Sequence, residues 1–162
     1  MVWIVEVGYK KHVTDPVGFM TKKDIDELGI QGVEDVRAIS TYTILGEITE
    51  EDVKKVSEEL LSDNQIQEYG YRGIGVKKPL EHEHTKGWVV EVGLKPGVMD
   101  AVGLSASSAI EILGIDTIKE IKTGNKYMLV GDISEEQVRK ICQRLLVNNM
   151  IQFYRYQKIG ES

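Results

Sequence analysis

Cysteine is nearly absent from this chain, and so are the sequence features of secreted, membrane-spanning and nucleic-acid-binding proteins. The single cysteine, Cys142, excludes an internal disulfide framework and predicts a reducing, cytoplasmic location. No apolar run approaches the length of a membrane span, and residues 1–4 lack the basic and apolar regions of a secretory signal. The formal net charge is −6, which argues against a broad basic surface. We therefore expect neither nucleic acid nor a membrane as partner.

What the chain contains instead is a second copy of itself. Shifted by about 85 residues, Trp3–Gly8 aligns with Trp88–Gly93, and the match continues without a gap. Later matches pair Leu28-Gly29-Ile30 with Leu113-Gly114-Ile115, Tyr42 with Tyr127, Gly46 with Gly131, Leu60-Leu61 with Leu145-Leu146, and Tyr69 and Tyr71 with Tyr154 and Tyr156. Two copies are too few for a solenoid, which generally needs at least three. They predict a fused dimer of like units related by a pseudo-two-fold axis.

The size of each copy indicates that the two share a core. A chain of about 70 residues is marginal alone, because small chains bury a smaller fraction of their surface. We therefore expect one domain built of two subdomains. The predicted boundaries are repeat 1 over 1–72, a polar, glycine-bounded linker over 73–87, repeat 2 over 88–157, and a C-terminal tail over 158–162.

Periodicity and capping residues predict the order β-α-β-β-α-β in each copy. Residues 2–9 alternate apolar side chains, as strands do, and Asp15-Pro16 is an N-cap followed by a first-turn proline. Thr49–Asp52 and Ser134–Gln137 are capping boxes that open second helices. The predicted strands are 2–9, 33–39, 42–48 and 65–71, then 89–95, 118–121, 127–133 and 150–156; the first helices run over 15–28 and from 100 to Gly114.

This order predicts an α+β fold of tandem ferredoxin-like repeats, with antiparallel sheets and helices on the outer face. Apolar residues stand at successive positions of the first strand, as in Trp3, Ile4 and Val5, so apolar side chains lie on both faces of the sheet. The other face of each sheet must therefore be covered, and we expect the sheet of the other copy to cover it.

Few residues suggest chemistry. Cys142 lies mid-helix and His12 lies in a loop, and neither has an identifiable catalytic partner. His82 and His84 alternate like a metal pair but have no further ligand nearby in the sequence. Glu6 and Glu91 are read as strand residues that face solvent or pair with a neighbouring lysine. We expect no catalytic residue, metal or cofactor on this chain.

The clearest difference between the copies lies in their first helices. Ser105–Ala109 is built of small residues, whereas the matching Met20–Asp24 is charged. Small residues allow another surface to approach closely, so the second copy's helix is a candidate docking face.

The loop of the second copy, Leu94–Gly103, reads Leu-Lys-Pro-Gly-Val-Met-Asp-Ala-Val-Gly. This loop and the duplicated element order resemble the PurS subunit family of phosphoribosylformylglycinamidine synthase. The first copy keeps Lys10, Asp15 and Gly18 but has Lys11-His12 in place of Pro-Gly. The resemblance covers both copies and identifies the chain as a tandem, fused-dimer PurS-like module, similar to the N-terminal domain of the single-chain synthases.

The resemblance implies a non-catalytic structural subunit or N-terminal domain of that enzyme. The enzyme converts formylglycinamide ribonucleotide, glutamine and ATP to the amidine in purine biosynthesis. The module would bridge the synthetase and glutaminase subunits or domains and help enclose ammonia transfer, and further self-association stays open. The expected partner contacts are Lys95, Pro96, Gly97, Asp100 and Gly103, with Lys10 and Asp15 from the first copy.

Two other functions remain open from the residues alone. An ACT-like tandem regulatory domain shares the element order and would bind a small molecule between the repeats, near Gly97 or His12. A self-contained enzyme would use His12 or Cys142.

Overall fold

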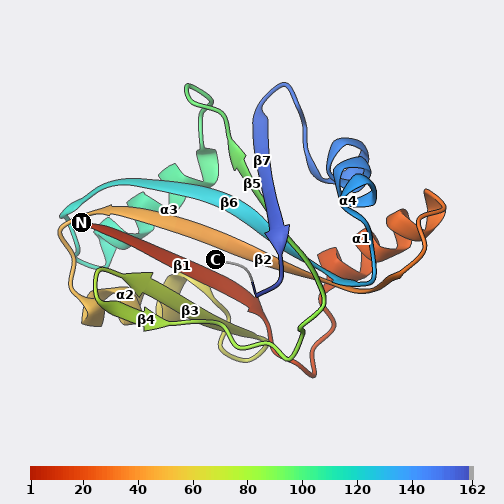
Figure 1. The fold of residues 1–162 in the computed structure, drawn as a ribbon. Coiled ribbons are helices and arrows are strands. Elements are labelled where there is room, and N and C mark those ends of the chain that lie inside the picture. The colour runs from red at the N-terminus through yellow and green to blue at the C-terminus, as the bar shows by residue number, and fades with distance from the viewer. Residues whose placement is uncertain (161–162) are drawn as a thin grey trace. The chain divides into compact units, whose positions relative to one another are not determined.

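The computed structural model describes residues 1–160 and confirms the α+β class, with antiparallel strands, α-helices and single π-helical turns (Figure 1). The elements are β1 (Val2–Tyr9), α1 (Pro16–Glu27), β2 (Val33–Gly46), α2 (Glu50–Val56), η1 (Ser57–Leu61), β3 (Gln67–Gly73), β4 (Val76–Lys78), β5 (Gly87–Leu94), α3 (Ala101–Ile112), β6 (Ile118–Gly131), α4 (Glu135–Ile141), η2 (Cys142–Leu146) and β7 (Gln152–Lys158). Within these residues no helix has the length and apolarity that a membrane span requires.

The helices begin where their capping residues predict. Thr49 accepts a hydrogen bond from the Asp52 N–H, and Ser134 and Gln137 form a complete, reciprocal capping box. Both second helices then end in a π-helical turn, η1 or η2, which the sequence pattern did not predict. The duplication therefore extends to irregular backbone.

The predicted turn in the middle of each copy is wrong. β2 and β6 are each a single strand of 14 residues where the sequence predicted two shorter strands. Ser40-Thr41 contains neither glycine nor proline, and Gly124 in the second copy does not adopt a positive φ. The two halves of each strand belong to different compact units, and each strand is continuous from one half to the other.

The compact units do not coincide with the sequence repeats. Unit 1 comprises Met1–Val13, Ser40–Glu81 and Met99–Thr123, and unit 2 comprises Thr14–Ile39, His82–Val98 and Gly124–Ser162. Each unit therefore combines segments of both repeats.

Unit 1 contains a full set of ferredoxin-like elements assembled from two repeats. Its strand order is β4-β3-β1-β2-β6, where β2 contributes its second half and β6 its first. β1 pairs with β2 from Val2–Leu45 to Val7–Ser40. The first helix and the second strand of this set, α3 and Ile118–Thr123, come from repeat 2. This is a helix–strand exchange within one chain.

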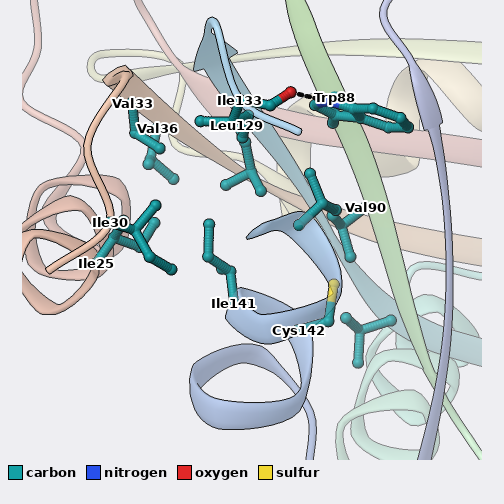
Figure 2. Close-up of a cluster of buried hydrophobic side chains, with 12 residues drawn as sticks. Ile25, Ile30, Val33, Val36, Trp88, Val90, Leu129, Ile133, Ile141 and Cys142 are labelled. Carbon is teal, nitrogen blue, oxygen red and sulfur yellow. Dashed lines mark hydrogen bonds between the residues drawn. The ribbon is translucent and has the colours of Figure 1, made fainter. Parts of the chain in front are cut away.

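Unit 2 is built in the same way, with strand order β2-β6-β5-β7 and with α1 supplied by repeat 1. Figure 2 shows Ile25 of α1 and Ile30 of the loop after α1 pointing toward Ile141 of α4. The Trp88 indole N–H donates to the Ile133 carbonyl at 3.0 Å, as Trp3 does to Ile48 at 3.3 Å in unit 1. The two cores are therefore equivalent in construction.

One side of the unit 1 sheet is covered in part by the chain itself. Repeat 2 contributes to this sheet edge to edge, as β6 beside β2. The chain after β4 crosses its face at Gly70, because a Cβ on Gly70 would lie 2.4 Å from the Leu80 nitrogen. Leu80 is buried there, at 8% exposure.

The segment predicted as a plain linker, 73–87, contains structure. It includes β4, which pairs with β3, and the first residue of β5. The predicted C-terminal tail, 158–162, starts on the last residue of β7 and continues as a turn at 159–160. Residues 161–162 lie outside the described part of the chain.

The placement of α3 in the unit 1 core predicts that two isoleucines of this helix contribute differently to stability. Ile110 of α3 is fully buried in the unit 1 core, whereas Ile112 on the same helix is 87% exposed. We expect Ile110→Ala to lower the free energy of unfolding by about 3 kcal/mol, because it leaves a cavity. Ile112→Ala should change it by less than about 0.5 kcal/mol. Urea denaturation measures both, and equal effects would contradict the placement of α3 in this core.

Candidate functional site

The predicted contact residues lie in two loops that begin with the same backbone bonds. The Lys10 N–H donates to the Ile66 carbonyl at 2.9 Å, and the Lys95 N–H donates to the Ile151 carbonyl at 2.8 Å. Each lysine carbonyl then accepts an N–H from three residues further along, which closes a turn. The loops are therefore anchored alike although their sequences differ.

The tip of the second loop is exposed. Pro96 and Gly97 are both exposed, and Gly97 has a φ of +87°, a value that favours glycine. Beside the tip, the Lys95 ammonium donates to the Asn149 carbonyl at 2.6 Å. The first loop has Lys11 and His12 at its tip, and both are exposed.

Asp100 uses its carboxylate to hold the fold. It accepts the Gly103 N–H at 2.8 Å, the Thr123 N–H at 2.6 Å and the Thr123 hydroxyl at 2.8 Å. Burial acts to raise its pKa, but the hydrogen bonds from Thr123 and Gly103 outweigh burial, and the pKa of Asp100 is lowered from 3.8. Asp100 therefore joins the start of α3 to β6.

Asp15 and the motif glycines repeat this arrangement. Asp15 accepts the Gly18 N–H at 2.9 Å and the Ala38 N–H at 2.7 Å, which joins α1 to β2. A Cβ on Gly18 would lie 2.2 Å from the Val36 carbonyl oxygen, so only glycine fits there. Gly103 has the same 2.2 Å approach, in its case to the carbonyl oxygen of Ile121. The Asp-x-x-Gly part of the motif thus fixes each exchanged helix to its strand.

The structure groups the predicted residues differently from the sequence. Lys10, Asp100 and Gly103 belong to unit 1, whereas Asp15, Lys95, Pro96 and Gly97 belong to unit 2. The exposed members, which are available to a partner, are Lys10, Lys95, Pro96 and Gly97.

Sequence reasoning missed exposed apolar side chains beside the motif. Val102 and Leu104 on α3 are each 60% exposed, and the equivalent Val17 and Phe19 on α1 are 52% and 64% exposed. Their recurrence at matching positions of both copies was the available signal.

On α3, only some of the small residues of Ser105–Ala109 are exposed. Ser105 and Ser108 are exposed, while Ala106 and Ala109 are partly buried. α3 has one charged residue, Glu111, whereas α1 has five. The docking role of α3 stays a prediction.

Of the residues considered for chemistry, Cys142 is buried in the core, and Glu6 and Glu91 each lie near an arginine. Burial raises the pKa of the Cys142 thiol to about 12, and the thiol is fully buried. Arg72 lies 4.0 Å from Glu6, and Arg155 pairs with Glu91, so an arginine takes the place of the expected lysine.

The histidines are on the surface or partly covered. His12 is exposed, and the rings of His82 and His84 stack with centroids 6.3 Å apart. Across residues 1–160, no cluster of three or more His, Cys, Asp or Glu side chains is placed to hold a metal ion.

A family model described as PurS, phosphoribosylformylglycinamidine (FGAM) synthase, matches the chain twice, over residues 3–74 and 88–160. The chain belongs to the PurS family. Its relatives include the synthase subunit PurS of Methanocaldococcus jannaschii, 32% identical over 73 residues, which are 40% of this chain and 84% of the relative. PurS of Bacillus subtilis is 28% identical over 72 residues, 42% of this chain and 86% of the relative. The match favours the PurS resemblance over the ACT-like alternative.

Solved PurS structures each align with about half of the chain. A crystal structure of B. subtilis PurS covers 45% of this chain and 96% of its own, at 26% identity and a TM-score of 0.42. The M. jannaschii PurS structure covers 48% and 99%, at 26% identity and a TM-score of 0.43.

The Asp100 hydrogen bonds predict an acid-dependent loss of stability. Because the folded pKa lies below the ordinary value, ionised Asp100 favours folding, fully above about pH 4 and progressively less as pH falls through the folded pKa. Asp100→Ala should lower the free energy of unfolding at pH 7 by about 1–2 kcal/mol and reduce its fall between about pH 4 and 2. Asp116→Ala, at an exposed residue of unit 1, is the control in the same urea titrations. Equal losses from both variants would contradict the capping role.

Proposed function

We propose that this chain is a non-catalytic structural subunit, or domain, of phosphoribosylformylglycinamidine synthase. The observation that carries the proposal is the family match to both repeats, 3–74 and 88–160. The relatives from M. jannaschii and B. subtilis are named as a subunit of this synthase, which supports partners that belong to the same enzyme. The reaction is the ATP-dependent conversion of formylglycinamide ribonucleotide to the amidine with nitrogen from glutamine.

The placement of the polar groups supports a structural role. Asp15 and Asp100 cap exchanged helices, Glu6 pairs with Arg72, and the Cys142 thiol is buried with a raised pKa. A side chain held in this way maintains the fold and is not free for acid–base or nucleophilic chemistry.

The role we assign is to bridge the synthetase and glutaminase components and help enclose the ammonia passed between them. Two equivalent units on one chain offer two similar surfaces, each with an exposed loop and exposed apolar side chains such as Val17 or Val102. Apolar side chains exposed at matching positions of both units are typical of contact surfaces.

Reconstitution with purified synthetase and glutaminase subunits tests this role. We expect the three components to co-elute in gel filtration with light scattering, in the presence of glutamine and Mg-ADP. Glutamine-dependent amidine formation should require this chain, whereas formation from added ammonium should not, because ammonium bypasses the transfer. Glutamine-dependent activity at full rate without this chain would reject the proposal.

Loop variants test the predicted contacts without disturbing the caps. Lys95→Ala with Pro96→Ala should weaken complex formation by about tenfold, the effect of losing about 1.4 kcal/mol of contact energy. Lys10→Ala with Lys11→Ala in the first loop is the matched control and should have a smaller effect, since the second loop keeps the family motif. Asp100 is left unchanged because its loss would destabilise α3. A titration in which neither pair alters the dissociation constant would exclude both loops as contacts.

A further inference from the structure

The solvent-facing side of α3 in unit 1 carries large apolar side chains. Val102, Leu104 and Ile112 are exposed, whereas Ile110 of the same helix is fully buried in the unit 1 core. Met99, just before the helix, is 76% exposed. The core does not use these exposed side chains, and a group of exposed apolar side chains is typical of a contact surface.

The spacing of the exposed residues on α3 suits contact with another helix. The residues along its outward line, at intervals of three and four, are Ala101, Ser105, Ser108 and Ile112. At 3.6 residues per turn, Val102 and Leu104 lie to opposite sides of this line. The distance between two packed helices depends on the side chains at the contact, so the small residues on the line allow a close approach.

The neighbour of α3 in unit 1 adds negative charge. η1, from repeat 1, lies beside α3, from repeat 2, and carries Glu58 and Glu59, both exposed. α3 adds Glu111, and neither segment contains lysine or arginine. Among residues 1–160, neither Glu59 nor Glu111 has an ion-pair partner. The exposed residues of Ala101–Ile112 and Ser57–Leu61, here called the α3–η1 surface, therefore combine apolar side chains with unpaired carboxylates.

The equivalent helices of unit 2 differ in charge. α1 and η2 together carry three carboxylates and three basic residues, and Lys22 pairs with Asp26 at 3.0 Å. Arg144 of η2 stands at the position of Glu59. Because the two units are built alike, the fold does not require a surface without basic residues. The charge of the α3–η1 surface is therefore available to select a partner.

We propose that the α3–η1 surface binds a basic, amphipathic helix of a partner subunit. The apolar stripe of that helix covers Leu104 and Ile112, and its lysine or arginine side chains pair with Glu59 and Glu111. A second copy that uses the same surface is disfavoured as the occupant, because two such surfaces bring like charges together. This inference rests on the proposed function, since the partner is a component of the synthase.

Photo-crosslinking in the reconstituted complex identifies the occupant. Benzoylphenylalanine replaces Ser108, which is exposed on α3, and in the control it replaces Lys23, the exposed equivalent on α1. The complex with the synthetase and glutaminase subunits is irradiated, and the crosslinked peptides are identified by mass spectrometry. Position 108 should crosslink to a helical segment of a partner subunit in which lysine and arginine outnumber the acidic residues. Position 23 should not yield that product.

Two exposed isoleucines test the apolar contact. Ile112 is 87% exposed on α3, and Ile74 is 83% exposed in the turn between β3 and β4 of the same unit. Neither alanine substitution should change the thermal stability of the free chain, because both side chains are already in water. Ile112→Ala should weaken complex formation by about tenfold. Ile74→Ala is the control and should leave the dissociation constant unchanged.

Reciprocal exchange of charge tests the electrostatic contribution. Glu59→Arg gives η1 the residue of η2, and Arg144→Glu makes the opposite change in unit 2. Glu59→Arg should weaken complex formation about fivefold at about 0.05 M salt but less than about twofold at 1 M, where the Debye length is about 3 Å. Arg144→Glu should not reproduce this salt-dependent loss.

The contrary results separate this inference from the proposed function. A complex that forms with full affinity for both Ile112→Ala and Glu59→Arg leaves the proposed function standing and rejects the α3–η1 site. A crosslink from position 108 to another copy of this chain, or to a segment without excess basic residues, rejects the proposed occupant. If the unaltered chain forms no complex, the proposed function fails, and the inference fails with it.

Discussion

The exchange of α1 and α3 between the repeats is the constraint on which both cores depend. Ile25 from repeat 1 is fully buried in unit 2, and Ile110 from repeat 2 is fully buried in unit 1. Each isoleucine fills a space that the other repeat leaves empty. A fully buried aliphatic side chain contributes about 1.5–3 kcal/mol from transfer alone, a large fraction of the stability of a small domain. Neither repeat completes its own core.

The same exchange explains the family motif. Asp15 and Asp100 each accept hydrogen bonds from the start of a helix and from the strand that follows, so each carboxylate joins helix to strand. Gly18 and Gly103 let the helix touch that strand directly. The motif therefore serves the exchanged piece first, and its exposed lysine, proline and glycine remain for contacts with other proteins.

Local elements could be predicted from the sequence because their signals are local. β1 begins and ends at the predicted residues, and Asp15, Asp100, Thr49 and Ser134 cap helices as predicted. The continuity of β2 through Ser40 could not be predicted, because a strand that ends there and a strand that continues have the same alternation pattern on either side. The exchange could not be predicted either, since Ile110 has the same apolar spacing whichever unit receives it. Among the candidate site residues, the loop positions were identified by motif, but the inward orientation of Asp100 depends on Thr123, 23 residues later.

Covalent fusion removes a restriction that acts on every symmetric pair of identical subunits. In a homodimer a residue must suit both places it occupies, so a change that helps one surface is imposed on the other. Here Gly70 can remain small where the chain crosses the sheet while Arg155 is large at the matching position. Likewise α1 can carry five charges while α3 carries one. Duplication within one chain thus allows two surfaces of common ancestry to specialise for different neighbours.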